Sequence, residues 1–155
     1  MMPKEQTPDF IERTQKIVKS YHAEWDVTIL INCCVGLLII PFTEISSKKY
    51  SKHLNGDINK SEWGIALKDV KIETDYSIKN ITRRLRNSIA HNRFVYLPKS
   101  DNAKIIGEIK FTDRANGSRS DNFELTVSVE DFRKFLDKLS QTMLEFKEKS
   151  NIRKT

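Results

Sequence analysis

A single apolar run limits the folds open to this chain. Residues 27–42 read VTILINCCVGLLIIPF, a stretch that contains Asn32 and closes with Pro41 and Phe42. The run is a little short for a membrane span, and proline stops a helix. We therefore expect the central buried helix of a soluble bundle, and a membrane-spanning helix is the less favoured alternative.

Helical periodicity surrounds this run. A first helix is expected after Thr7, with Pro8 in its first turn. Its pattern continues to Ile40, either as one long helix or as two with a bend near His22. A further helix is expected over residues 75–94, with Thr74 or Asp75 as its N-cap and an apolar stripe of Ile78, Ile81, Leu85 and Ile89.

The last helix is expected to start near Ser128, which forms a capping-box pattern with Asp131. Its apolar face comprises Phe132, Phe135, Leu136, Leu139, Met143 and Phe146.

Two alternating segments precede the last helix. In KIIGEIKFT, Ile105, Ile109 and Phe111 share one face, and FELTVSV alternates in the same way around a polar turn with an Asn-Gly pair. The segment EWGIALKDV is expected to be a brief helix or an elbow, and residues 43–61 a polar loop, with a short helical turn within it as an alternative. The sequence thus predicts one mainly α domain over residues 1–155. It is a four- to five-helix up-down bundle with a helical core at about 8–94 and 130–149, and a β-hairpin inserted at about 104–129.

The composition indicates which classes of partner, compartment and cofactor are compatible with the chain. The net charge of +6 and the pI near 9.3 are compatible with RNA, DNA or an acidic protein, and equally with a solvated lysine-rich surface. The adjacent Cys33 and Cys34 do not suit disulfide geometry, which indicates buried reduced thiols. The N-terminal residues lack an apolar signal region, so a cytoplasmic protein is expected. The histidines lack metal-ligand spacing and no Gly-rich phosphate loop occurs, so we expect no metal site and no cofactor.

The helix of residues 75–94 ends in an unusual polar cluster, RLRNSIAHNRF. At about 100° per residue, Asn87 and His91 are i, i+4 neighbours on the face away from the apolar stripe. Arg83 and Arg84 lie on the same side of the helix as Asn87. Arg86 is turned about 140° from His91, although its long side chain has room to reach back.

Such a set suits phosphodiester cleavage without a metal. A histidine transfers protons near neutral pH, and arginine binds phosphoryl oxygens bidentately as negative charge develops. The plainer interpretation is a basic helix end that balances the negative helix dipole, with His91 as a partial cap.

These residues resemble a known family. The segment RNSIAH, Arg86 to His91, is similar to the Arg-x4–6-His motif of the HEPN superfamily (higher eukaryotes and prokaryotes nucleotide-binding), whose members often have Asn directly after the Arg. The apolar helix and the Trp-Gly element EWGIAL are typical of its bacterial toxin-like branch. The resemblance covers about residues 9–94, with the last helix completing the bundle and the hairpin as a decoration of one branch.

The resemblance implies a metal-independent endoribonuclease, a toxin or an anti-phage (abortive-infection) effector. His91 is then the general acid/base, Arg86 stabilises the scissile phosphate, and Asn87 orients His91 or the phosphate. Family members commonly form homodimers in which two motifs face one cleft. A cognate antitoxin or nucleotidyltransferase is a further expected partner.

Arg83, Arg84 and Arg93 are candidate contacts to the RNA backbone. Weaker candidates are Tyr96 for base stacking and, in the polar loop, Lys48, Lys49, Tyr50, Lys52 and His53.

Two alternatives stay open. One is a non-catalytic HEPN module that binds RNA, a nucleotide or a partner protein. The other is a basic helical adaptor outside the family, in which His91 packs inward or only caps its helix.

Overall fold

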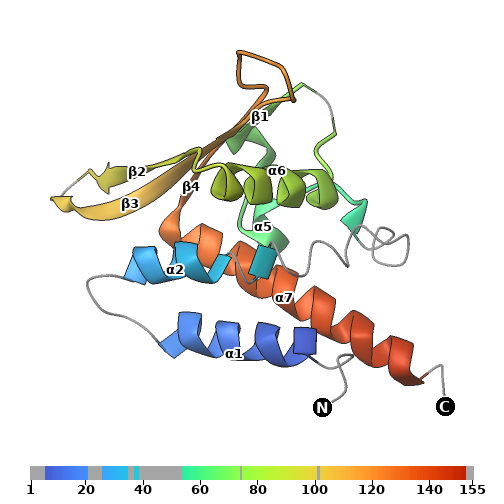
Figure 1. Cartoon of the computed structure of the whole chain (residues 1–155). Coiled ribbons are helices and arrows are strands. Elements are labelled where there is room, and N and C mark those ends of the chain that lie inside the picture. The colour runs from blue at the N-terminus through green and yellow to red at the C-terminus, as the bar shows by residue number, and fades with distance from the viewer. Residues whose placement is uncertain are drawn as a thin grey trace.

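The described chain contains both helices and strands, with three helices first and three consecutive strands before the last helix (Figure 1). The computed structural model describes residues 6–20, 26–34, 37–38, 54–73, 75–100 and 102–152. Its helices are α1 (Gln6–Ser20), α2 (Asp26–Cys34), α5 (Lys60–Trp63), α6 (Ile78–Ala90) and α7 (Val129–Ile152), with a 3-10 turn η4 at Leu67–Asp69. Its strands are β1 (Val70–Ile72), β2 (Phe94–Lys99), β3 (Asn102–Asp113) and β4 (Phe123–Ser128).

The strands form one four-stranded antiparallel sheet in the order β1-β4-β3-β2. The prediction of a mainly α bundle with an inserted hairpin was therefore wrong, and the fold is mixed α/β. The two expected strands, β3 and β4, do pair, with Phe111 opposite Leu125. They form the centre of the sheet rather than an isolated decoration, because β1 and β2 add a strand on either side.

The two outer strands lie in segments whose sequence pattern did not indicate a strand. The segment EWGIALKDV, expected to be a helix or an elbow, contains the end of α5, the turn η4 and the first residue of β1. The helix expected to reach Phe94 ends at Ala90, and the chain enters β2 at Phe94. Lys60 and Ser61, expected in a loop, open α5.

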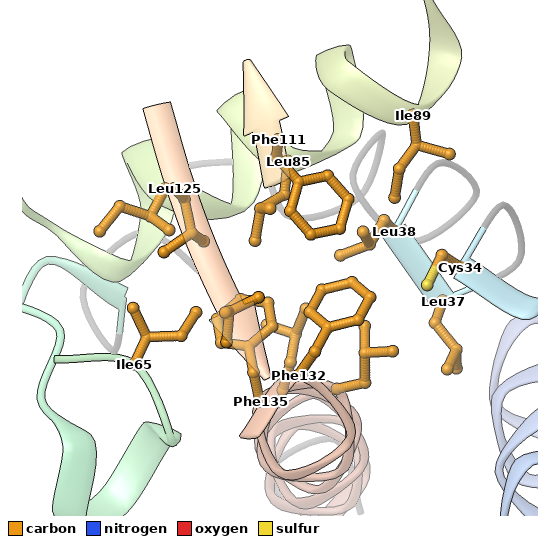
Figure 2. Close-up of a cluster of buried hydrophobic side chains, with 14 of the residues drawn as sticks. Cys34, Leu37, Leu38, Ile65, Leu85, Ile89, Phe111, Leu125, Phe132 and Phe135 are labelled. Atoms are coloured by element: carbon orange, nitrogen blue, oxygen red, sulfur yellow. The ribbon is translucent and has the colours of Figure 1, made fainter. Parts of the chain in front are cut away.

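One face of the sheet carries the core. Phe111 of β3 and Leu125 of β4 point toward Phe132 and Phe135 of α7, and Leu85 of α6 closes the cluster from the opposite side (Figure 2). Ring contacts continue through the cluster, with 5.0 Å between the centroids of Phe111 and Phe132. Cys34, Leu37 and Leu38 also pack into this core. Burial of each large apolar side chain contributes about 1.5–3 kcal/mol, so this cluster holds α6 and α7 against the sheet.

The other face of the sheet is mainly polar on β3 and β4, whereas β2 contributes Val95 and Leu97 to it. Glu124 accepts from Lys71 of β1 and from Lys110 of β3, each at 2.7 Å, and thereby links three strands. This alternation is the pattern of an antiparallel sheet with one solvated face. Ile105 is an exception to the predicted inward face, because its side chain is 50% exposed. It lies on the part of β3 that extends beyond the pairing with β4.

The structure describes only parts of the predicted helical pattern in the apolar region. α1 ends at Ser20 and α2 runs from Asp26 to Cys34, so the predicted bend near His22 and the stop at Pro41 lie outside the described residues. Within the described part, Val27, Leu30 and Ile31 are buried, as expected for a central helix.

The predicted N-cap of α7 is confirmed, whereas that of α6 was wrong. The backbone N–H of Asp131 donates to Ser128 Oγ at 3.0 Å, which is the expected cap of α7. α6 is capped by Ser77, whose hydroxyl accepts from the backbone N–H of Asn80, and not by Thr74 or Asp75. Asp75 instead has a φ of 55° and accepts from the backbone N–H of Ser77, so it forms the turn before the helix.

Both thiols are free, and burial raises the pKa of Cys33 and, more strongly, of Cys34. A thiol held protonated is a poor nucleophile, which fits a packing role. Within the described ranges, no helix combines the length and apolar character that crossing a bilayer requires.

Candidate functional site

The C-terminal turn of α6 places the histidine of the motif. The backbone N–H of Arg93 donates to the carbonyl of Ser88 at 2.7 Å, and that of Asn92 donates to the carbonyl of Ile89 at 3.1 Å. Asn92 has a φ of 52°. These are the two bonds and the left-handed residue of a Schellman motif, with His91 as the C-cap. His91 is exposed, so it caps the helix through its backbone and leaves its ring in solvent.

A buried carboxylate organises the polar side of α6. Asp113, the last residue of β3, has a side chain that is 1% exposed. Its Oδ2 accepts from Arg84 Nη1 at 3.0 Å and from Asn87 Nδ2 at 3.2 Å, and its Oδ1 accepts from Arg93 Nη1 at 3.3 Å. A buried charge is tolerated only where it is paired and hydrogen-bonded, and Asp113 meets both conditions.

The same cluster fastens the strand ends to the helix. Arg84 Nη1 also donates to Asn122 Oδ1 at 3.0 Å, and the backbone N–H of Asn122 donates to the carbonyl of Asp113 at 3.0 Å. Ser88 Oγ donates to the carbonyl of Thr112 at 2.7 Å. The loop between β3 and β4, residues 114–122, is therefore held at its base by α6.

Asn87 connects this cluster to the motif arginine. Its Oδ1 accepts from Arg86 Nη2 at 2.7 Å, while its Nδ2 faces Asp113. The contact that it makes with His91 is through the backbone, where the His91 N–H donates to the Asn87 carbonyl at 2.9 Å. Its side chain therefore orients Arg86 rather than the imidazole.

These side chains line a hollow of about 460 Å³. Five of the six predicted site residues contribute to it, namely Arg83, Arg84, Arg86, Asn87 and His91, together with Arg114, Ala115 and Asn116 from the β3–β4 loop. Four arginines line the hollow and one of them, Arg84, is paired with Asp113 at 3.0 Å, so the lining carries an excess of positive charge, which suits an anionic ligand. Partial burial lowers the pKa of Arg83 and repulsion from Arg84 lowers it further, yet a guanidinium stays charged at neutral pH.

The remaining candidates have other positions. Arg93 is not part of the lining and pairs with Asp113 from the start of β2. Tyr96 lies on β2, 38% exposed, with its ring 5.6 Å from that of Phe94. The weaker candidates of the polar loop, Lys48, Lys49, Tyr50, Lys52 and His53, lie outside the described residues.

Sequence reasoning missed Asp113, Asn122 and Arg114. A signal for Asp113 was present, because it continues the buried face of Ile109 and Phe111 at a spacing of two. An acid on an inward face requires cationic partners, and the arginines of α6 were available for that role. Nothing in the local pattern indicated Arg114.

The cluster is built for anions rather than cations. Among the residues that the structure describes, no three histidine, cysteine, aspartate or glutamate side chains come together as metal ligands. The carboxylate of Asp113 accepts from two guanidinium groups and one amide.

Comparison with known proteins identifies a family. A model of the family described as HEPN pEK499 p136 matches residues 2–150. No curated protein gives a significant match, and no solved structure does.

Proposed function

The chain belongs to the HEPN family, and from that premise we propose that it is a metal-independent endoribonuclease of the toxin or anti-phage type. The observation that carries the proposal is the hollow itself, in which Arg86, Asn87 and His91 lie together among further arginines. An exposed imidazole beside guanidinium groups matches what cleavage of an RNA phosphodiester requires.

The chemistry assigns one task to each group. His91 takes the proton of the 2′-hydroxyl as the 2′-oxygen attacks phosphorus, and Arg86 binds the non-bridging oxygens as their charge grows. The bond from phosphorus to the 5′-oxygen breaks, that oxygen takes up a proton from water, and the protonated His91 returns its proton to the solvent. The products are a 2′,3′-cyclic phosphate and a 5′-hydroxyl.

The other arginines of the site would bind the RNA backbone or hold neighbouring side chains in place. Arg83 is exposed, lines the hollow and donates to Asn80 Oδ1 at 2.6 Å, so it is a candidate contact for a neighbouring phosphate. Arg84 and Arg93 each form an ion pair with Asp113, which offsets their positive charge. We therefore expect each of them to contribute less to RNA binding than Arg83. We also propose a homodimer in which two hollows share one RNA strand, with an antitoxin or a nucleotidyltransferase as a further partner.

Cleavage of labelled RNA in the presence of a chelator tests the proposal. His91→Ala is expected to lower kcat by about 10²–10⁴-fold, and Arg86→Ala by about 10²–10³-fold. Lys79→Ala, also on α6 but away from the hollow, is the matched control and should cleave normally. Cleavage that survives both site substitutions contradicts the assignment. Sedimentation of the native chain tests the homodimer, which a monomer at micromolar concentration would exclude.

The second candidate is a non-catalytic HEPN module. It is favoured because Arg84, Arg93 and Asn87 all contact Asp113. Such a cluster would also be present if these residues served only to stabilise the fold. In that case the native chain binds RNA in the hollow, His91→Ala leaves binding unchanged, and neither protein produces cyclic phosphate ends.

A further inference from the structure

The proposed reaction uses Arg86 and His91, and it leaves the buried Asp113 without a task. Asp113 comes from β3, outside the motif, yet it is the acceptor for two arginines and for Asn87. Its side chain is 1% exposed, so it has no access to an RNA strand. Any effect that it has on the site must pass through the groups to which it is bonded.

The bond to Asn87 has a directional consequence. A carboxylate only accepts hydrogen bonds, so the amide of Asn87 must turn its NH₂ group toward Asp113. The amide oxygen then faces the other way, where it accepts from Arg86 Nη2 at 2.7 Å. An amide turned by 180° would direct N–H groups at a guanidinium that has no lone pair to offer.

The second bond determines where the guanidinium lies. Arg86 and His91 are separated by about 140° around the helix, whereas Asn87 is only about 40° from His91. A bond from Arg86 to Asn87 therefore swings the guanidinium toward the face of His91. Both side chains do line the same hollow, despite their positions on the helix.

From this chain of contacts we propose that Asp113 is a positioning residue. It fixes the amide of Asn87, and through that amide it holds Arg86 beside His91. The proposal deepens the proposed endoribonuclease function and assigns no contact between Asp113 and RNA. Its test therefore starts with a readout that needs no activity.

That readout is the position of Arg86 in solution. The Nε–H signal of Arg86 and the Nδ2–H signals of Asn87 are followed by ¹⁵N NMR in the full chain, assigned with Arg86→Lys and Asn87→Ala. Asp113→Asn is expected to shift or broaden both sets of signals, because an amide at position 113 no longer dictates the direction of the Asn87 amide. Asp113→Glu retains the charge on a longer side chain and serves if Asp113→Asn does not fold. It should displace the same signals.

Thr82→Ala is the matched control for lost stability. Thr82 is fully buried on α6, and its hydroxyl donates to the carbonyl of Ile78 at 2.7 Å, apart from the Asp113 cluster. The substitution should lower Tm and leave the Arg86 signal in place. An Arg86 signal that is unchanged in folded Asp113→Asn or Asp113→Glu overturns the proposal.

Measurements of RNA cleavage provide a second test of the proposal. In the native background, Asp113→Asn is expected to lower kcat on single-stranded RNA by on the order of 10²-fold with little change in KM. In an Asn87→Ala background the same substitution should have a much smaller effect on kcat, because the intermediary is already absent. Equal losses in both backgrounds would show that Asp113 does not act through Asn87. If the native chain cleaves no RNA, the endoribonuclease function fails, and the NMR comparison alone decides the role of Asp113.

Discussion

Gly64 occupies a position where the fold leaves no room for a side chain. It is the C-cap of α5 with a φ of 77°, and its N–H donates to the carbonyl of Lys60 at 3.0 Å. A Cβ built at this position would lie 2.5 Å from the backbone oxygen of Asp131, in the first turn of α7. The glycine of the Trp-Gly element thus allows α5 to approach the start of α7, where Trp63 meets Phe135.

Three glycine substitutions separate the steric cost at Gly64 from the cost of its backbone conformation. Gly117→Ala has the same backbone strain at a φ of 80° but no neighbour within 4 Å, so we expect a loss of about 1 kcal/mol. Gly64→Ala adds the contact with the Asp131 backbone and is expected to lose about 3 kcal/mol. Gly56→Ala has neither problem and should stay within about 0.5 kcal/mol of the native chain. Denaturant unfolding measures all three, and equal losses for Gly64→Ala and Gly117→Ala would contradict the steric argument.

Single residues also show where sequence reasoning fell short. The motif on α6 was recognisable because its members, Arg86, Asn87 and His91, lie close together in sequence. Asp113 was missed although its inward position follows from strand alternation, because the identity of its partners depends on how β3 docks against α6. Local periodicity gives the face of a residue and not the element that it meets.

At the scale of elements, α6 ends in a way that serves the site. The Schellman turn stops the helix at the residue before His91 and turns the chain into β2 within three residues. Arg93, just after the turn, then reaches back to Asp113 at 3.3 Å. The end of the helix and the start of the strand are therefore joined by the same carboxylate.

Substitutions of Asn92 test this turn. Asn92→Gly should keep or slightly raise Tm, because glycine accepts a positive φ without strain. Asn92→Val should lose about 1–2 kcal/mol, which corresponds to a Tm lower by about 2–8 °C for a chain of this size. Thermal unfolding followed by circular dichroism provides the measurement. A valine variant as stable as the glycine variant would argue against the left-handed turn.

The elements that the sequence did not reveal are the two outer strands. β1 has three residues, which is too short for a period of two to be recognised. β2 reads FVYLPK, with apolar residues on both faces and a proline that weakens a strand assignment. Each strand also directly follows a segment with a helical pattern, which hides where the strand begins. The longer helices, α1, α2, α6 and α7, and the central hairpin were predictable because each repeats its period over several turns or residues.

At the scale of the whole molecule, the fold brings α6 and the β3–β4 loop, which are distant in sequence, together around the hollow. Arg83, Arg84, Arg86 and His91 come from α6 and its cap, and Arg114 comes from the loop after β3. The core of Phe111, Leu85 and Phe132 fixes the distance between the two (Figure 2). The loop thus adds Arg114, Ala115 and Asn116 to the lining that α6 provides.

Arg114 and Arg119 provide a matched pair for this loop. Both are exposed, and only Arg114 lines the hollow. Arg114→Ala is expected to weaken binding of single-stranded RNA about tenfold, and to reduce the slope of log affinity against log salt by about 0.7. Arg119→Ala removes the same charge and should have a smaller effect. Fluorescence anisotropy over a range of salt concentrations measures both, and equal effects would mean that only net charge matters.

The long sequence separation within the Asp113 cluster has a consequence for synthesis of the chain. Arg84, Asn87 and Arg93 precede their shared acceptor by 29, 26 and 20 residues. A ribosome-bound nascent chain that stops short of β3 already carries the whole Arg86 to His91 segment, but it lacks the carboxylate that sets it in order. The arginines are therefore synthesised before Asp113, the carboxylate that positions them. The nascent chain thus carries an incompletely folded site while it is still close to ribosomal RNA.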